Sequence, residues 1–468
     1  MSRAPRAAGT LRLPSTLTAV ATAGVTALVL AGCGAGSTGA ADATGAAGRA
    51  LPADGSTQSS AVAGVAAAGA VGAAGSTGAA AAGSGTAQAA PAKGRAASSQ
   101  RGGSAASPRA AAPTAAKAAK PAAAPRSGPK PTPLPRGAVV VGRGTAASCT
   151  QAALRSAVRR VVARRSGTVS FSCGPRAVTI ALTAPLKFSG SASSKYVLDG
   201  RRMVTLDGRN RTGLVELPEV AGLSATFRNL TFRRARTATQ GAAIHGGWRN
   251  RLLVENSSFV ANTSTSARGD FDGGGAIYVH EGTATVRGSR FSGNTALNGG
   301  AIQNTIGTLT IERSTFTGNR ATVRRTGGGG GAVYSDSGRL VVRRSTISRN
   351  TARLQGGGLF VFNAKDKTSR IEDSTISGNT VSDRGSGGFG GGIRVGQGPL
   401  VVVRTAFTAN RASAQGGALY VADDAAVRID GSRFTRNRAD QGGALFRVSG
   451  SLTTTRCRFS GNTPADVR

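Results

Sequence analysis

The acidic residues that could do chemistry fall into two groups. Asp270 and Asp272 lie shortly before His280 and Glu281, and a second pair stands at Asp423–Asp424. Paired carboxylates, or a carboxylate beside a histidine, can act as general acid and base, and two carboxylates can cleave a glycosidic bond. Adjacent aspartates are also typical of a solvated turn. Neither group matches a defined catalytic motif, so we expect no catalytic site.

The chain contains two histidines, His245 and His280, which lie far apart in the sequence. A catalytic zinc site needs three protein ligands, so we expect neither a metal nor another cofactor. The tripeptide Arg268–Gly269–Asp270 matches an integrin-binding sequence, but so short a match arises easily by chance.

Two short patterns alternate from residue 241 onward and indicate a repeat architecture. The first is a glycine pair, a small residue and an aliphatic residue, as in Gly274-Gly-Ala-Ile277. The second is an aromatic residue or isoleucine three positions before an asparagine. Its members are Phe259/Asn262, Phe291/Asn294, Phe316/Asn319, Ile347/Asn350, Ile376/Asn379, Phe407/Asn410, Phe434/Asn437 and Phe459/Asn462.

Alignment on the second pattern reveals columns with a period of two, which is typical of strands with one buried face. The column five positions earlier is aliphatic, and the column two positions earlier holds small residues that end in Cys457. The aliphatic column is Val254, Val286, Ile311, Val342, Ile371, Val402 and Ile429. No helical segment separates the strands, so each repeat is one coil of a β-solenoid. We expect the asparagines to adopt left-handed turn conformations and to hydrogen-bond from coil to coil.

These paired motifs resemble the repeats of the polymorphic outer-membrane protein family, which is similar to pectin-lyase-like proteins. The resemblance covers about residues 225–465 and implies an all-β, right-handed parallel β-helix. Enzymes of this superfamily cut acidic polysaccharides, but the polygalacturonase and pectate-lyase motifs are missing from this sequence. Fold alone does not supply function.

The residue after each aliphatic position of the glycine motif should point outward. With His245 before them, these residues form a predicted outer column: His245, Tyr278, Gln303, Tyr334, Phe360, Arg394, Tyr420 and Phe446. Aromatic faces beside polar groups suit sugar rings, and arginine can pair with an acidic sugar. The column is therefore our candidate glycan-binding site, unless neighbouring loops cover it.

Cys149 and Cys173 flank a segment whose apolar residues fall on one helical face, and an alternating strand pattern ends at Cys173. We predict a disulfide between them that fastens a capping α-helix to the first strand and contributes roughly 3 kcal/mol.

The first residues predict export. Arg3, Arg6 and Arg12 precede an uncharged stretch, and Leu30-Ala31-Gly32-Cys33 resembles a bacterial lipobox. The resemblance implies acylation of Cys33 and an outward-facing lipid anchor. We expect a signal peptide at 1–32, a disordered Ala/Gly/Ser/Pro-rich tether at 33–136, a cap with the first coils at 137–225, and repeats at 226–468.

The formal net charge is +38. The arginines are spread along the chain without a nucleic-acid-binding motif, so we do not expect nucleic acid as a partner. Anionic polymers of the cell envelope are more compatible with an exported protein. The candidate contact is a basic loop edge formed by Arg320, Arg324, Arg325, Arg384, Arg411 and Arg438.

Three functions therefore remain open. The first is non-catalytic surface binding or adhesion, which we favour. The second is a polysaccharide lyase or glycoside hydrolase, and the third is a passive spacer. A carboxylate cluster beside the outer column would favour the enzyme, an open column without such a cluster would favour binding, and loops that seal the column would favour the spacer.

Overall fold

The computed structural model describes residues 130–266, 272–323, 328–383, 385, 387–464 and 466–467. The predicted signal peptide, Cys33 and most of the predicted tether lie outside the described residues. The tripeptide 268–270 and Arg324, Arg325 and Arg384 also lie outside them. No helix in the described part of the chain is long and apolar enough to cross a membrane.

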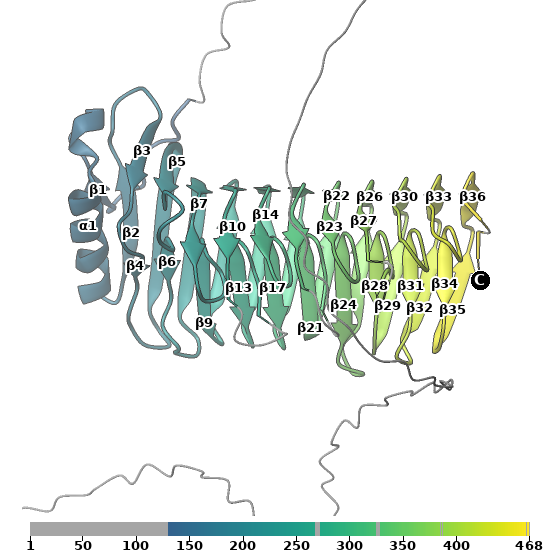
Figure 1. The fold of residues 1–468 in the computed structure, drawn as a ribbon. Coiled ribbons are helices and arrows are strands. Elements are labelled where there is room, and N and C mark those ends of the chain that lie inside the picture. The colour runs from purple at the N-terminus through teal and green to yellow at the C-terminus, as the bar shows by residue number, and fades with distance from the viewer. Residues whose placement is uncertain are drawn as a thin grey trace, which may run out of the picture. The chain divides into compact units, whose positions relative to one another are not determined.

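The described chain is a right-handed parallel β-solenoid of about 11 turns, which confirms the predicted all-β parallel β-helix (Figure 1). Three parallel sheets run along it, and β21 (Val333–Arg343) belongs to both sheet A and sheet B.

Sheet A contains β1 (Val139–Val141), β2 (Ser166–Phe171), β3 (Val178–Ala181), β5 (Lys195–Asp207), β7 (Ser224–Arg233), β10 (Arg251–Glu255), β11 (Ser258–Val260), β14 (Thr283–Arg287), β15 (Arg290–Ser292), β18 (Thr308–Glu312), β19 (Thr315–Thr317), β22 (Thr346–Ser348), β25 (Ser369–Glu372), β26 (Thr375–Ser377), β29 (Pro399–Val403), β30 (Ala406–Thr408), β32 (Ala426–Asp430), β33 (Arg433–Thr435), β35 (Ser451–Thr455) and β36 (Arg458–Ser460). Sheet B contains β4 (Leu186–Lys187), β6 (Val215–Glu216), β9 (Ile244–Trp248), β13 (Ile277–His280), β17 (Ile302–Thr305), β24 (Leu359–Asn363), β28 (Ile393–Val395), β31 (Leu419–Val421) and β34 (Leu445–Arg447). Sheet C contains β8 (Arg236–Thr237), β12 (Thr263–Ser264), β16 (Thr295–Ala296), β20 (Arg320–Ala321), β23 (Thr351–Ala352) and β27 (Thr380–Val381).

The interior consists of stacked identical positions. The aliphatic column from Val254 to Ile429 is fully buried. The phenylalanines stack in the same way, with ring centroids 4.5 Å apart from Phe259 to Phe291 and again from Phe291 to Phe316. This spacing is close to the strand separation in a sheet, so each coil repeats the packing of its neighbour.

The asparagine column is a buried hydrogen-bond ladder. The Asn262 amide nitrogen donates to Oδ1 of Asn294 at 2.9 Å, and the backbone N–H of Asn262 donates to the same oxygen at 3.0 Å. Equivalent bonds continue to Asn462. The predicted left-handed conformation is wrong for these asparagines, because the preceding residue adopts it, for example Gly293 at φ +62°.

The glycine pairs serve two different purposes. Gly330 has a φ of +70°, which a side chain rarely adopts. A Cβ on Gly331 would lie 2.1 Å from the carbonyl oxygen of Gly357 in the next coil. The corner therefore excludes side chains at both positions.

The first coil carries the described helix, α1 (Gln151–Ala163). The side chain of Thr150 caps it by accepting a hydrogen bond from the backbone N–H of Ala153, and its apolar face packs against β1 and β2. A disulfide joins Cys149 to Cys173, as predicted, with Cα atoms 5.7 Å apart.

Sheet A also carries a column of alternating charge on successive coils from β5 to β25. In-register neighbours on successive coils are Asp199, Arg228, Glu255, Arg287, Glu312, Arg343 and Glu372. Ion pairs connect them, including Arg287 with Glu255 at 3.4 Å and with Glu312 at 3.1 Å. We call this column the charge ladder. It places opposite charges beside each other at successive coils.

Candidate functional site

The outer face of sheet B carries two rows of side chains. The first row is the predicted outer column, and its members pair in register from coil to coil. The second row lies two positions further along each strand, or three on the bulged β9, and was not considered from the sequence. It contains Trp248, His280, Thr305, Asp336 and Phe362.

The exposure of the first row, which the sequence left open, differs along the row: its middle and much of its C-terminal part are buried. His245, Tyr278 and Phe446 are half-buried. The five residues between Tyr278 and Phe446 are only 1–8% exposed, namely Gln303, Tyr334, Phe360, Arg394 and Tyr420. These five residues form part of the packing of the solenoid rather than an open ribbon.

Contacts with other aromatic rings explain this burial. Tyr334 stacks on Phe360 at 4.8 Å, and Phe389, from the loop before β28, stacks on Tyr420 at 4.8 Å. The Arg394 guanidinium lies 4.7 Å above the Phe360 ring. It also pairs with Asp423, which lies in the predicted exposed turn.

Both histidines and the only tryptophan of the chain gather at the N-terminal end of this face. In-register pairing places Tyr278 beside His245, and His280 beside Trp248. The His245 and Tyr278 rings stack at 5.5 Å, and the Tyr278 and His280 rings lie 5.9 Å apart. Together with Glu219 and Glu281 we call these residues the histidine site.

A glycine-dependent bulge positions the site. The register between β9 and β13 shifts at Gly246–Gly247. A Cβ on Gly247 would lie 2.0 Å from the carbonyl oxygen of Pro218. Because Gly247 has no side chain, the loop before β7 can approach β9 closely. This close approach places Glu219 beside His245.

Glu219 links the two aromatic residues of β9. One carboxylate oxygen lies 3.3 Å from Nε2 of His245, and the other accepts the backbone N–H of Trp248 at 2.7 Å. Nδ1 of His245 lies 3.1 Å from the carbonyl oxygen of Gln240. The imidazole ring is therefore oriented by a partner at each nitrogen.

Glu281 forms the opposite side of the site. It accepts a hydrogen bond from Nε of Arg249 at 2.9 Å, and its other oxygen lies 3.8 Å from Nε2 of His280. Hydrogen bonds from Arg249 and Trp248 lower the pKa of the Glu281 carboxyl, despite an opposing effect of burial. The Arg249 guanidinium also lies 4.4 Å from the centre of the Trp248 ring.

Tyr278 connects the two halves of the site. Burial raises the pKa of its hydroxyl, the nearby charges of Glu219 and Asp272 raise it further, and a hydrogen bond with Thr305 opposes the shift. The phenol is therefore neutral at physiological pH and can donate a hydrogen bond.

The predicted acidic candidates do not form a dyad in the described residues. Asp272 is buried and accepts hydrogen bonds from Gln240 and Ser266, each at 2.6 Å. Asp424 is exposed beside Asp423, and Asp270 lies outside the described residues. The described residues contain no group of three His, Cys, Asp or Glu side chains that could hold a metal ion.

Sequence reasoning missed Glu219, Trp248, Arg249 and Asp336. Glu219 and Trp248 lie in early coils where the repeat motif is degenerate, so the alignment did not reach them. The single tryptophan was the one available signal.

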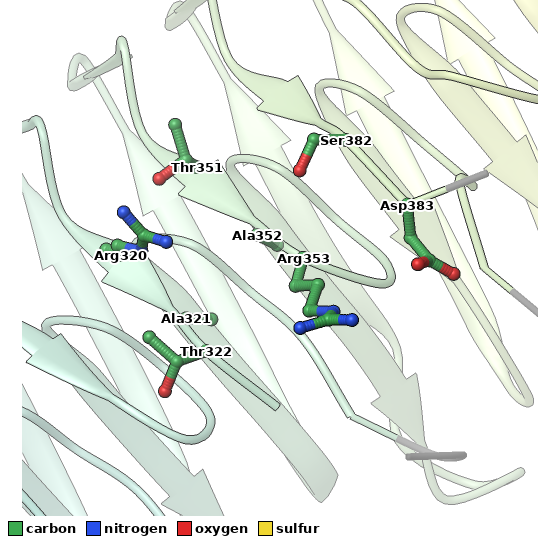
Figure 2. Close-up of a pocket in the computed structure, with 8 residues that line it drawn as sticks. All are labelled: Arg320, Ala321, Thr322, Thr351, Ala352, Arg353, Ser382 and Asp383. Carbon is green, nitrogen blue, oxygen red and sulfur yellow. The ribbon is translucent and has the colours of Figure 1, made fainter. Parts of the chain in front are cut away.

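The described arginines of the predicted basic edge share one register position, which begins in sheet C. Arg320 begins β20 and pairs in register with Thr351 on the next coil. The same register position holds Arg411 two coils beyond Thr351, and Arg438 three coils beyond it. A pocket of about 450 Å³ lies at this edge. Arg320 and Arg353 share its lining with Asp383 (Figure 2). The carboxylate offsets part of the positive charge there.

Comparison with known families matches residues 219–399 to the family described as right handed beta helix region. The catalytic unit of a thermostable GH87 alpha-1,3-glucanase from Streptomyces thermodiastaticus strain HF3-3 is 14% identical, with a TM-score of 0.42 over 72% of this chain and 70% of that chain. The Azotobacter vinelandii mannuronan C-5 epimerase AlgE4 A-module is 13% identical, with a TM-score of 0.31 over 70% of this chain and 94% of that chain. No curated protein matches the chain. The family match supports the β-helix fold, and the finer resemblance to polymorphic outer-membrane protein repeats stays a prediction.

Proposed function

We propose that this protein binds polysaccharide without cleaving it, and that the histidine site is the contact surface. The observation that carries the proposal is the convergence of both histidines, the only tryptophan and Tyr278 on adjacent coils. Adjacent coils lie about 4.8 Å apart, so these rings form a short aromatic platform. Sugar rings pack against aromatic faces while their hydroxyls bond to polar side chains.

The charges around the platform favour a hydroxyl-rich ligand over a polyanion. Glu219 and Glu281 flank the rings, and Arg249 is already paired with Glu281. Carboxylates accept hydrogen bonds from sugar hydroxyls and repel acidic sugars. Binding at this site should therefore depend weakly on salt.

A polysaccharide pull-down with the full chain at two salt concentrations tests the proposal. Trp248→Ala should abolish salt-resistant retention on the bound polysaccharide, whereas Phe446→Ala, at the other end of the first row, should leave it unchanged. Equal loss in both variants would contradict a localised site. Absence of retention on every polysaccharide would favour the passive spacer.

A specific observation also favours a second function, the cleavage of polysaccharide. His245 is paired with Glu219 beside Tyr278, so a carboxylate that could accept a proton lies near a neutral phenol that could protonate a leaving group. Product analysis distinguishes the two functions. Released oligosaccharides that disappear in His245→Ala would establish a lyase or hydrolase, whereas unchanged polymer would support binding alone.

We also propose that Cys33 is acylated and that residues 34–136 tether the solenoid to the outer side of the cell membrane. The lipobox and the signal-like first residues support this localisation, as does a disulfide typical of oxidising compartments. Cys33→Ser should release the protein into the medium, and globomycin should block its processing. Membrane association that persists in Cys33→Ser cells would contradict the lipid anchor.

A further inference from the structure

A second concave surface lies on sheet A in the last coils of the solenoid. It is an open pocket of about 580 Å³, and its charged lining consists of Arg404, Arg433, Arg456, Arg458 and Asp373. We call it the arginine basin. It lies on a different sheet from the histidine site, and its charge has the opposite sign.

Arg433 and Arg458 occupy the same position on adjacent coils. They pair in register between β33 and β36, and both side chains are exposed. Neither forms an ion pair with a described residue, in contrast to Arg404 and Arg456 nearby. Like charges directly opposite each other in a sheet are destabilising, and no acidic residue relieves this pair.

Arg404 and Arg456 are held at the rim of the basin. Nε and an Nη of Arg404 donate to Asp373 at 2.7 and 3.1 Å, and Nε of Arg456 donates to Asp430 at 2.9 Å. These hydrogen bonds lower the pKa of both aspartates, so the carboxylates stay ionised and the two guanidinium groups stay oriented. Four arginines therefore surround the basin against two carboxylates.

The charge ladder shows that this excess is not a general property of sheet A. At the ladder, an acidic residue follows each arginine on the next coil from Asp199 to Glu372. In the column of Arg433, the positions on the four preceding coils are neutral at Thr315, Thr346, Thr375 and Ala406, and Arg290 stands alone before them, between Ser258 and Thr315. Among the described residues, this column therefore holds two arginines on successive coils only at Arg433 and Arg458, where the surface is concave.

We infer that the arginine basin binds a phosphate or sulfate group carried by an anionic polysaccharide. Guanidinium groups from adjacent coils, about 4.8 Å apart, can reach one tetrahedral anion together. A phosphate or sulfate ester offers three terminal oxygens to these donors, whereas a carboxylate offers two. The basin would hold the charged part of a polymer independently of the neutral sugar contacts proposed for the histidine site.

The test uses four dextrans with the same backbone: neutral, carboxymethylated, sulfated and phosphorylated. The full chain should bind the sulfated or phosphorylated dextran, and Arg433→Ala/Arg458→Ala should weaken this binding by about tenfold at fixed salt. Arg159→Ala/Arg160→Ala is the control, because it removes an equal charge from two exposed arginines of α1 in the first coil, neither of which forms an ion pair with a described residue. It should bind as the unmodified chain does.

Three outcomes would overturn the inference. Equal losses in both double variants would mean that binding follows net charge. If Arg433→Ala/Arg458→Ala weakens binding to carboxymethyl dextran as much as binding to the sulfated or phosphorylated dextran, the basin does not prefer tetrahedral anions. Binding to phosphatidylglycerol vesicles that requires this pair, without binding to the dextrans, would assign the site to lipid headgroups.

Two controls separate the inference from the proposed function and from misfolding. Trp248→Ala should retain full binding to sulfated or phosphorylated dextran, even if the histidine site proves to bind nothing. Without ligand, the Arg433→Ala/Arg458→Ala variant should unfold at the same temperature as the unmodified chain or slightly above it, because the substitution removes like-charge repulsion. A large fall in that temperature would contradict the assignment of these arginines to binding rather than to the fold.

Discussion

The two ends of the first row on sheet B share one register and differ in their surroundings. At the N-terminal end, His245 and Tyr278 are half-buried and face Glu219 and the second row. Further along, Phe360 and Tyr420 are 3% and 7% exposed beneath other aromatic groups. The same sequence pattern therefore produces a candidate binding surface at one end and an outer layer of packing at the other.

Register and exposure therefore have separate causes. Register follows from the repeated inward residues and is the same in every coil. Exposure depends on side chains such as Phe389, which come from loops that do not repeat.

Phe360→Ala should lower the free energy of unfolding by about 3 to 5 kcal/mol, because it removes a buried ring that contacts both Tyr334 and Arg394. Denaturant-induced unfolding at constant pH measures this loss. A loss below about 1 kcal/mol would mean that the middle of the row is not part of the packed structure.

Asp423→Ala should destabilise the protein by about 2 kcal/mol, because it leaves the Arg394 guanidinium buried without its ion-pair partner. Two other nitrogens of Arg394, Nε and Nη1, have no hydrogen-bond partner among the described residues. Asp424→Ala is the matched control and should change stability little, since Asp424 is exposed. Equal effects in the two variants would remove the role assigned to this ion pair.

Tyr278→Ala should cost only about 1 kcal/mol of stability, because the ring is half-buried and its hydroxyl has one assigned partner, Thr305. Its effect on polysaccharide binding should be much greater. If this variant loses as much stability as Phe360→Ala, the two ends of the row do not differ as described.

Asp336→Asn should stabilise the protein at pH 7 and have little effect at pH 3. Burial raises the pKa of the Asp336 carboxyl, against hydrogen bonds with Ser337 and Tyr334. The folded protein therefore binds a proton there more tightly than the unfolded chain does. Stability from this group is complete below the unfolded pKa and is lost as pH rises through the folded pKa. Thermal unfolding across pH 3 to 7 checks the sign, and a destabilising effect at pH 7 would reverse it.

Most of the fold could be predicted from the repeats in the sequence. The Phe and Asn columns predicted the coils and the ladder, and the flanking patterns predicted the Cys149–Cys173 disulfide, because each depends on local periodicity. The left-handed turn position was misplaced by one residue, since periodicity does not report φ. The column of small residues ends at Cys457, which is half-exposed because it lies on the last coil rather than between coils.

The candidate site was only partly predictable. His245 and Tyr278 were found because they follow the repeat. Glu219 was missed because its position depends on the close approach of Pro218 to Gly247, a contact between segments outside the aligned motif. Burial of Tyr334 and Arg394 was missed because aromatic contacts across coils decide it.

The most direct test of the proposed binding surface is tryptophan fluorescence during titration with a polysaccharide that the full chain retains in pull-downs. Trp248 is the only tryptophan, so the signal reports this site alone. We expect a saturable change in Trp248 emission, and its midpoint should match the independently measured Kd. The change should persist at high salt. Binding of the polysaccharide without any change in Trp248 emission would contradict the histidine site as its contact surface.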